Sequence, residues 1–184
     1  MALSEPADLA GSRLRLVPTP YDDPVVRALV DEVQEVYVDR YGGPDETPMD
    51  AIQFAPPCGH FVVGYLHGEP AAIGGWRLRT GHGAAGLPGR RPAEIKRMFV
   101  REPLRGRGLA RAVLAELESS AAAAGVDWLV LETGERQPEA IALYGSAGYA
   151  AVRPFGLYSF EDGSVYLGKH LPALSESVRL SVNP

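Results

Sequence analysis

Apolar residues recur at helical spacing in the first third of the chain. The segment follows Asp23-Pro24, where an aspartate can cap free N–H groups and a proline suits the first helical position. Its apolar positions are Val25, Val26, Leu29, Val30, Val33, Val36 and Tyr37, and its charged positions are Arg27, Asp31, Glu32, Glu35 and Asp39. This pattern predicts an amphipathic helix that Gly42-Gly43-Pro44 ends.

Short apolar runs on both sides of this helix predict strands. The segment LRLVP at 14–18 comes before it, and runs at 60–66 and 71–78 come after it. A turn around Gly68-Glu69 joins the last two runs into a predicted β-hairpin. Residues 47–57 lie between the helix and the hairpin, and there we expect a short loop or helix.

The second half of the chain alternates between strand-like and helix-like segments. Residues 94–100 and 128–133 predict strands, the latter buried on both faces. Helices are predicted from Leu109 to Gly125 and over 138–147, where Gly148 stops the second one. This alternation indicates an α/β sheet. The glycine-rich stretch 80–89 is expected to be a loop.

Composition sets limits on the class of protein. At 184 residues with 46% hydrophobic content the chain fits one domain, with a core over about 14–171 and a loosely ordered tail over 172–184. We see no secretory signal and no apolar run of ~18 residues, so we expect a soluble, cytoplasmic protein without a membrane partner. Cys58 is the only cysteine, and the four histidines are scattered, so no disulfide or metal site is expected.

Positive charge is concentrated in one segment of an acidic chain. The net charge is -5, yet the segment from Arg90 to Arg111 holds eight basic residues against Glu94 and Glu102. A cluster of basic residues of this kind, a basic island, is expected to focus its electric field on one anionic ligand, whereas a nucleic-acid-binding protein usually spreads its positive charge along a face. We therefore expect no nucleic-acid partner.

The turn RGRGLA, which opens the helix at Leu109, has the features of a diphosphate cradle. Gly106 and Gly108 let backbone amides approach an anion, and the helix start adds free N–H groups and a positive dipole end. The turn is not a P-loop, because the chain contains no Lys-Ser or Lys-Thr pair. It is not a dinucleotide fingerprint either, because Arg111 stands where the third glycine belongs.

Two motifs resemble the GNAT acetyltransferase superfamily. The first is R-x-x-G-x-G/A, here at Arg105, Gly108 and Ala110. The second is A-x-x-L-Y-x-x-x-G-Y, which ends the chain's last predicted helix. Its residues are Ala140, Leu143, Tyr144, Gly148 and Tyr149. The resemblance covers about 14–171, and it departs from many relatives at Arg136-Gln137, where they carry asparagine.

The resemblance implies a fold and an activity. The implied GNAT fold is α/β (α+β), a central mixed but mostly antiparallel twisted sheet of six to seven strands. About four helices flank the sheet, which splays between the two strands that hold CoA. The implied enzyme moves an acetyl group from acetyl-CoA to a primary amine, on a small molecule or a peptide, by direct transfer in a ternary complex. A homodimer is compatible with it, and the alternative is a non-catalytic acyl-CoA-binding regulatory module.

The resemblance also assigns cofactor-binding residues. Backbone groups of the strand at 94–100 would bind the pantetheine arm as an added strand, and the RGRGLA turn would hold the diphosphate. The expected cofactor-binding residues are Met98, Phe99, Val100, Arg105, Gly106, Arg107, Gly108, Leu109, Ala110, Pro138, Ala140 and Tyr144.

The catalytic candidates are one phenol and one carboxylate. By resemblance Tyr144 is the general acid that protonates the leaving thiolate, and the alternative is a core tyrosine. Glu94 is the expected base, because at period two it would share a strand face with Lys96, Met98 and Val100. An ion pair with a nearby arginine is the alternative role for Glu94, and Glu132 is the reserve candidate for the base.

Aromatic residues are the candidates for the acceptor pocket. Tyr37 and Tyr41 lie at the end of the first helix, and Trp76 lies on a predicted strand. Core packing is the alternative for Tyr37 and Trp76.

Overall fold

The computed structural model describes residues 14–156 and 162–172. Its strands are β1 (Arg15–Pro18), β2 (Gly59–Leu66), β3 (Glu69–Leu78), β4 (Pro92–Val100), β5 (Trp128–Gly134), β6 (Ala150–Ala151) and β7 (Ser164–His170). Its helices are α1 (Pro24–Tyr41), α2 (Leu109–Ala123) and α3 (Pro138–Ser146), with 3₁₀ turns η2 (Ala51–Phe54), η3 (Gly81–Ala84) and η4 (Glu102–Leu104). The tail predicted over 172–184 lies almost wholly outside the described residues.

The strands form one mixed sheet. Their order is β1-β2-β3-β4-β5-β7-β6, and β4–β5 is the parallel pair in an otherwise antiparallel sheet. This confirms the predicted fold class. Within the described residues the sheet is flanked by three α-helices rather than about four, because residues 51–54 form a single 3₁₀ turn.

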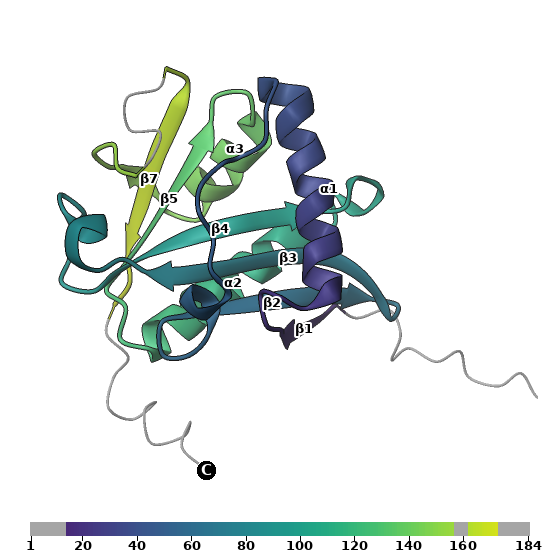
Figure 1. Ribbon diagram of the computed structural model, residues 1–184, viewed down its shortest axis with the longest axis horizontal. Coiled ribbons are helices and arrows are strands. Elements are labelled where there is room, and N and C mark those ends of the chain that lie inside the picture. The colour runs from purple at the N-terminus through teal and green to yellow at the C-terminus, as the bar shows by residue number, and fades with distance from the viewer. Residues whose placement is uncertain (1–13, 157–161, 173–184) are drawn as a thin grey trace, which may run out of the picture.

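Helix α1 begins and ends where the sequence predicted. The Asp23 carboxylate accepts a hydrogen bond of 2.8 Å from the N–H of Val25, and Gly42 ends the helix in a left-handed conformation with φ +83°. Val26 and Leu29 are fully buried against the sheet residue Ile73. Helix α1 therefore covers one face of the sheet, in front of β3 and β4 in Figure 1. Among the described residues no helix is long and apolar enough to cross a membrane.

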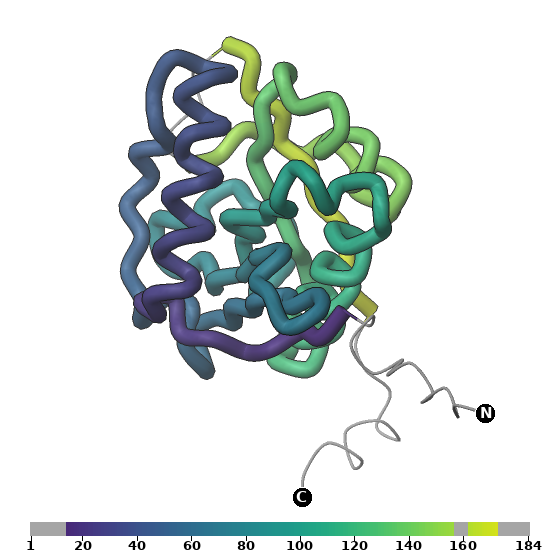
Figure 2. Tube along the Cα trace, turned by 90° about the vertical axis from the view of Figure 1, so that its right-hand side faces the viewer, coloured from purple at the N-terminus to yellow at the C-terminus, as the bar shows by residue number. Residues whose placement is uncertain are grey.

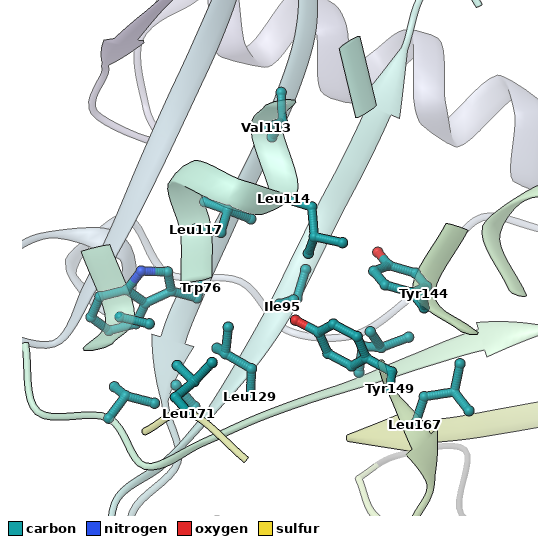
Figure 3. Packing of buried hydrophobic residues seen from close by; sticks show 14 of the residues in the cluster. Trp76, Ile95, Val113, Leu114, Leu117, Leu129, Tyr144, Tyr149, Leu167 and Leu171 are labelled. Carbon is teal, nitrogen blue, oxygen red and sulfur yellow. The ribbon is translucent and has the colours of Figure 1, made fainter. Parts of the chain in front are cut away.

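Helices α2 and α3 cover the opposite face. Figure 2 shows α1 on one side of the molecule and the green turns of α3 on the other. Leu114 and Leu117 of α2 pack with Ile95 and Leu129 of the sheet, and Tyr144 of α3 joins the same core (Figure 3). The core under α2 and α3 is thus distinct from the core under α1, and a third, smaller cluster forms around Val130, Phe155 and Tyr166.

The β2–β3 hairpin turns one residue earlier than predicted. His67 and Gly68 both have positive φ, +54° and +82°, which is the conformation of a two-residue turn that matches strand twist. Leu66 and Glu69 flank the turn as the last strand pair. Glu69 therefore belongs to β3 and not to the turn.

Strands β4 and β5 separate soon after they begin. They pair only over Pro92–Glu94 and Trp128–Val130, and Figure 1 shows them diverging toward their carboxyl ends. Within β4, Arg97 has φ +58°, and the register with β3 shifts between Ile73 and Gly75. This is a bulge, which adds a residue to one strand and bends it.

Because of the bulge, the residues of β4 after Arg97 point to the opposite faces from those that strict alternation predicts. Met98 packs with Ile95 in the core under α2, whereas Phe99 packs in the core under α1. Strict alternation would have placed Ile95 and Met98 on opposite faces. The prediction that Glu94 shares a face with Met98 and Val100 is therefore wrong, since the extra residue at Arg97 reverses the alternation.

Candidate active site

A cavity of about 410 Å³ opens where β4 and β5 separate. Beyond Glu94, β4 pairs only with β3, so its other edge is left open toward this cavity. Met98, Phe99 and Val100 line the cavity on that edge. Their free backbone groups can pair with the amides of an extended ligand.

The RGRGLA turn forms the entrance of this first cavity, at the start of α2. Gly106 and Gly108 adopt left-handed conformations with φ +76° and +82°, and no side chain caps the helix. The N–H groups of the first turn therefore remain available to an anion. Arg105, Gly106, Gly108, Leu109 and Ala110 all line the cavity, as predicted.

Two predicted cofactor residues do not line the first cavity, and among the residues that line it without having been predicted is a third arginine near the RGRGLA turn. Arg107 and Pro138 are absent from its walls, whereas Arg111 lines it and donates a hydrogen bond of 2.8 Å to the hydroxyl of Ser146. Arg111 lies in the first turn of α2, on the face toward α3. The motif spacing gave no reason to separate it from the other arginines.

Tyr144 lines the first cavity from α3. Its ring packs edge to face against Tyr149 with centroids 5.4 Å apart, as Figure 3 shows, and only 5% of the residue is exposed. Burial raises the pKa of the Tyr144 phenol above its usual value. The phenol is therefore protonated at neutral pH and can donate a hydrogen bond or a proton.

A second cavity of about 630 Å³ adjoins the first. Both cavities share six lining residues, which mark their junction: Tyr37, Asp45, Lys96, Glu132, Thr133 and Gln137. Tyr41 lines the second cavity, and its hydroxyl accepts a hydrogen bond of 3.1 Å from the Gln137 side chain. The structure thus brings the predicted residues Tyr37 and Tyr41 together.

Trp76 lies elsewhere, contrary to the prediction. It is 2% exposed in the core under α2, and its indole N–H donates a hydrogen bond of 3.0 Å to the hydroxyl of Ser120. It lines neither of the two cavities. The strand alternation of β3 directs it away from α1, so Trp76 is a core residue.

Glu94 also lies outside both cavities. Its Oε2 accepts hydrogen bonds from Arg77 at 3.0 and 3.1 Å and from Arg79 at 3.1 Å, and its side chain is 4% exposed. Arg77 in turn donates to the carbonyl of Pro48 and to Gln53. The ion-pair role that the sequence left open for Glu94 is therefore the one observed, and its burial leaves no path to an acceptor amine.

Glu132 takes the position that was expected of Glu94. It projects from β5 into the junction and lines both cavities. Burial raises the pKa of its carboxyl, against the opposing effects of a hydrogen bond from Ser164 and the charge of Lys96. A carboxylate with a raised pKa in a cavity has the properties of a general base.

The basic island is divided among several ion pairs rather than focused on one ligand. Arg97 donates a hydrogen bond of 2.6 Å to Asp45, and Lys96 lies 3.6 Å from the same carboxylate. Arg101 pairs with Glu32 on α1. Of the eight basic residues, Arg105 and Arg111 line the first cavity beside the start of α2. Three others, Lys96, Arg97 and Arg101, form ion pairs within the fold.

Asp45 is a site residue that the sequence did not indicate. Burial favours its protonated form, but Lys96 and Arg97 outweigh this effect and hold the pKa of Asp45 below its usual range. The Gln34 side chain bonds both the N–H and the carbonyl of Asp45. Its loop position gave no signal in the sequence, although the predicted strand at 94–100 contains two adjacent charged residues, Lys96 and Arg97, which need a charged partner wherever the strand is buried. No metal-binding group of three or more acidic, cysteine or histidine residues occurs in the described parts of the chain.

Comparison with known proteins agrees with this geometry. The model of the acetyltransferase (GNAT) family matches residues 27–149. An "IAA acetyltransferase" of Azospirillum brasilense is 33% identical over 153 residues, which cover 83% of this chain and 94% of that protein.

Solved structures show the same fold. A Klebsiella pneumoniae protein, a candidate acyl-CoA N-acyltransferase, superposes with a TM-score of 0.69 at 26% identity, over 86% of this chain and 98% of its own. The GNAT domain of S. lividans PAT gives a TM-score of 0.65 at 26% identity, over 86% and 90% of the two chains.

Proposed function

The chain belongs to the GNAT acetyltransferase family, and from this premise we propose that it is an N-acetyltransferase. In this proposal it moves an acetyl group from acetyl-CoA to a primary amine by direct transfer. The observation that carries the proposal is the junction of the two cavities. The RGRGLA turn and Tyr144 line the first cavity, and the second cavity, which Tyr41 lines, meets it at Glu132.

The residues of the first cavity fit an acyl-CoA. The uncapped start of α2 and the side chains of Arg105 and Arg111 suit a diphosphate, which carries negative charge and needs N–H donors. The open edge of β4 at Met98–Val100 suits the amides of the pantetheine arm. When bound, acetyl-CoA would supply the acetyl group as a thioester.

The chain's own side chains would then handle the two protons. Glu132 accepts the proton of the attacking amine while the new N–C bond forms. Tyr144 donates its proton, or a hydrogen bond, to the sulfur as the C–S bond breaks. Tyr37, Tyr41 and Gln137 form the walls of the second cavity, which would hold the amine.

Cys58 gives no support for a covalent acetyl-enzyme. It is exposed on the loop before β2 and lines neither cavity. Direct transfer is therefore the route that the described residues favour.

A panel of amine acceptors tests the proposal. Small amines, amino acids and short peptides would each be incubated with acetyl-CoA, with CoA release followed by a thiol reagent and the product identified by mass. The proposal predicts an acetylated amine in step with CoA release. Tight acetyl-CoA binding with no transfer to any acceptor would contradict it and favour a regulatory module.

A further inference from the structure

One oxygen of Glu132 is held by the neighbouring strand. Glu132 lies directly opposite Tyr166 in the β5–β7 ladder, and Ser164 lies two residues earlier on the same face. The hydroxyl of Ser164 donates a hydrogen bond of 2.9 Å to Oε1 of Glu132. The hydroxyl of Tyr166 donates a longer one, 3.4 Å, to the same oxygen.

The other oxygen of Glu132 is free for chemistry. Within the described residues no hydrogen bond reaches Oε2. Glu132 lines both cavities, so its carboxylate has one oxygen fixed to β7 and one left for the junction. Glu132 is half-buried, and its Oε2 is not among the buried side-chain atoms that lack a partner in the described residues, so a molecule in the junction can reach this oxygen.

Charged groups on two neighbouring elements act on Glu132. Lys96 and Asp45 line the same junction, from β4 and from the loop after α1, and Glu94 acts from outside the cavities. Lys96 lowers the pKa of Glu132, whereas Asp45 and Glu94 raise it, and burial raises it most. The hydrogen bond from Ser164 acts against burial, since it stabilises the ionised form.

We infer that Ser164 is a positioning residue for the reaction. Its hydroxyl fixes Oε1 of Glu132 and keeps the carboxylate ionised, so that Oε2 faces the junction and receives the proton of the acceptor amine. This inference rests on the proposed function, because it assigns the base of that reaction. The proton balance is simple: the amine loses one proton as the N–C bond forms, and Oε2 of Glu132 gains it.

A titration of Glu132 in the ligand-free protein tests the hold of Ser164 on the carboxylate. The protein would be labelled with ¹³C at the glutamate side-chain carboxyl, and the Glu132 signal would be assigned by its loss in Glu132→Gln. In Ser164→Ala the midpoint should move to higher pH by on the order of one unit, since a hydrogen bond to a charged acceptor is lost. Ser164→Thr keeps a hydroxyl and should restore the wild-type midpoint.

Ser120→Ala is the matched control. It also removes a half-buried serine hydroxyl that is hydrogen-bonded, here to Trp76 and to the carbonyl of Leu117, but this serine lies on α2 and lines neither cavity. The Glu132 midpoint should stay unchanged in this variant. An unchanged midpoint in Ser164→Ala would overturn the positioning role of Ser164 without touching the proposed function.

A pH–rate profile joins this titration to catalysis. The acid limb of kcat/KM should move upward in Ser164→Ala by the same amount as the midpoint, because only the ionised base can accept the proton. At pH values on the acid limb, kcat/KM of Ser164→Ala should therefore be about tenfold lower than that of the wild type. At higher pH, where the base is ionised in both proteins, the difference should disappear. A midpoint that moves while the acid limb stays fixed would overturn the assignment of Glu132 as the base, and with it the inference.

Discussion

The two halves of the proposed site differ in the chemical groups that form them. The cofactor half, from β4 through the RGRGLA turn to α3, offers backbone groups: an open strand edge and an uncapped helix start. The acceptor half, from the end of α1 through the loop at 42–50, is held by charged side chains. Asp45 in that loop pairs with Arg97 and Lys96, and Arg77 bonds the carbonyl of Pro48.

This difference determines what each half tolerates. A backbone cradle depends on conformation, so glycines at fixed positions are its signature. A wall held by buried ion pairs depends on distant partners, and such pairs are costly to break. We therefore expect changes in the cofactor half to affect ligand binding and changes in the acceptor half to affect stability and acceptor affinity.

The largest expected effect concerns Gly108. Gly108→Val forces a β-branched residue into φ +82°, where the strain displaces the amides that open α2. The space around the added Cβ is open, with nothing within 4 Å, so backbone strain rather than a steric clash is the expected cause of the weaker binding. Calorimetry should show an affinity for acetyl-CoA at least ~10-fold weaker.

Gly125→Val is the control for strain alone. Gly125 follows the same helix, has φ +78° and also has open space around its Cβ. Both variants should lose about 1–3 kcal/mol of unfolding free energy, but only Gly108→Val should lose binding. Equal losses of acetyl-CoA affinity in the two variants would contradict the binding role of the RGRGLA turn, because strain at either end of α2 would then have the same effect.

The second prediction concerns the Tyr144 hydroxyl. Tyr144→Phe keeps the ring packing, so acetyl-CoA affinity should change little while turnover falls by ~10²-fold. Tyr149→Phe is the control, because it removes a buried phenol hydroxyl from a residue that lines neither cavity, on a ring that touches that of Tyr144. Comparable turnover in Tyr144→Phe and the wild type would return Tyr144 to a packing role.

The third prediction concerns the wall of the acceptor half. Asp45→Asn leaves Arg97 and Lys96 buried without their shared carboxylate, so the unfolding free energy should fall by about 3 kcal/mol. The KM for the acceptor should rise several-fold while acetyl-CoA affinity is kept. Denaturant unfolding and steady-state kinetics measure the two effects.

Acid should remove the same contribution in the wild type. Because the folded state holds the pKa of Asp45 below its usual range, its stabilising effect is present above about pH 4 and is lost as pH falls below that value. Glu32→Gln is the matched control, since its pair with Arg101 is about one-third exposed and should contribute at most about 1 kcal/mol. A smaller loss in Asp45→Asn than in Glu32→Gln would contradict the ion-pair account of the wall.

The sequence predicted most of the residues that line the first cavity near the RGRGLA turn and α3. The turn and the two helices there are formed by residues close together in the sequence. Gly108 and Tyr144 stand at motif positions that are defined by sequence spacing and do not depend on how the side chains pack. The order of strands and helices was also predictable from apolar periodicity, since each period depends on neighbours a few residues away.

The acceptor half was harder to predict because its contacts are long-range. The bulge at Arg97 leaves no mark in the sequence, yet it reverses the faces of β4 and moves Glu94 away from Met98. The partners of Glu94 are a strand away on β3, and Asp45 meets Lys96 across 51 positions of the chain. Such pairings depend on register, which composition does not specify.

The most direct test of the central claim compares Glu132→Gln with Glu94→Gln in pH–rate profiles. The claim is that the reacting point lies at the junction of the two cavities, with Glu132 as the base. Glu132→Gln should therefore fold normally, turn over ~10²-fold more slowly and lose the acid limb. Glu94→Gln should be less stable, because Arg77 and Arg79 lose a buried partner, but should keep the acid limb. An acid limb that survives in Glu132→Gln and disappears in Glu94→Gln would contradict the account.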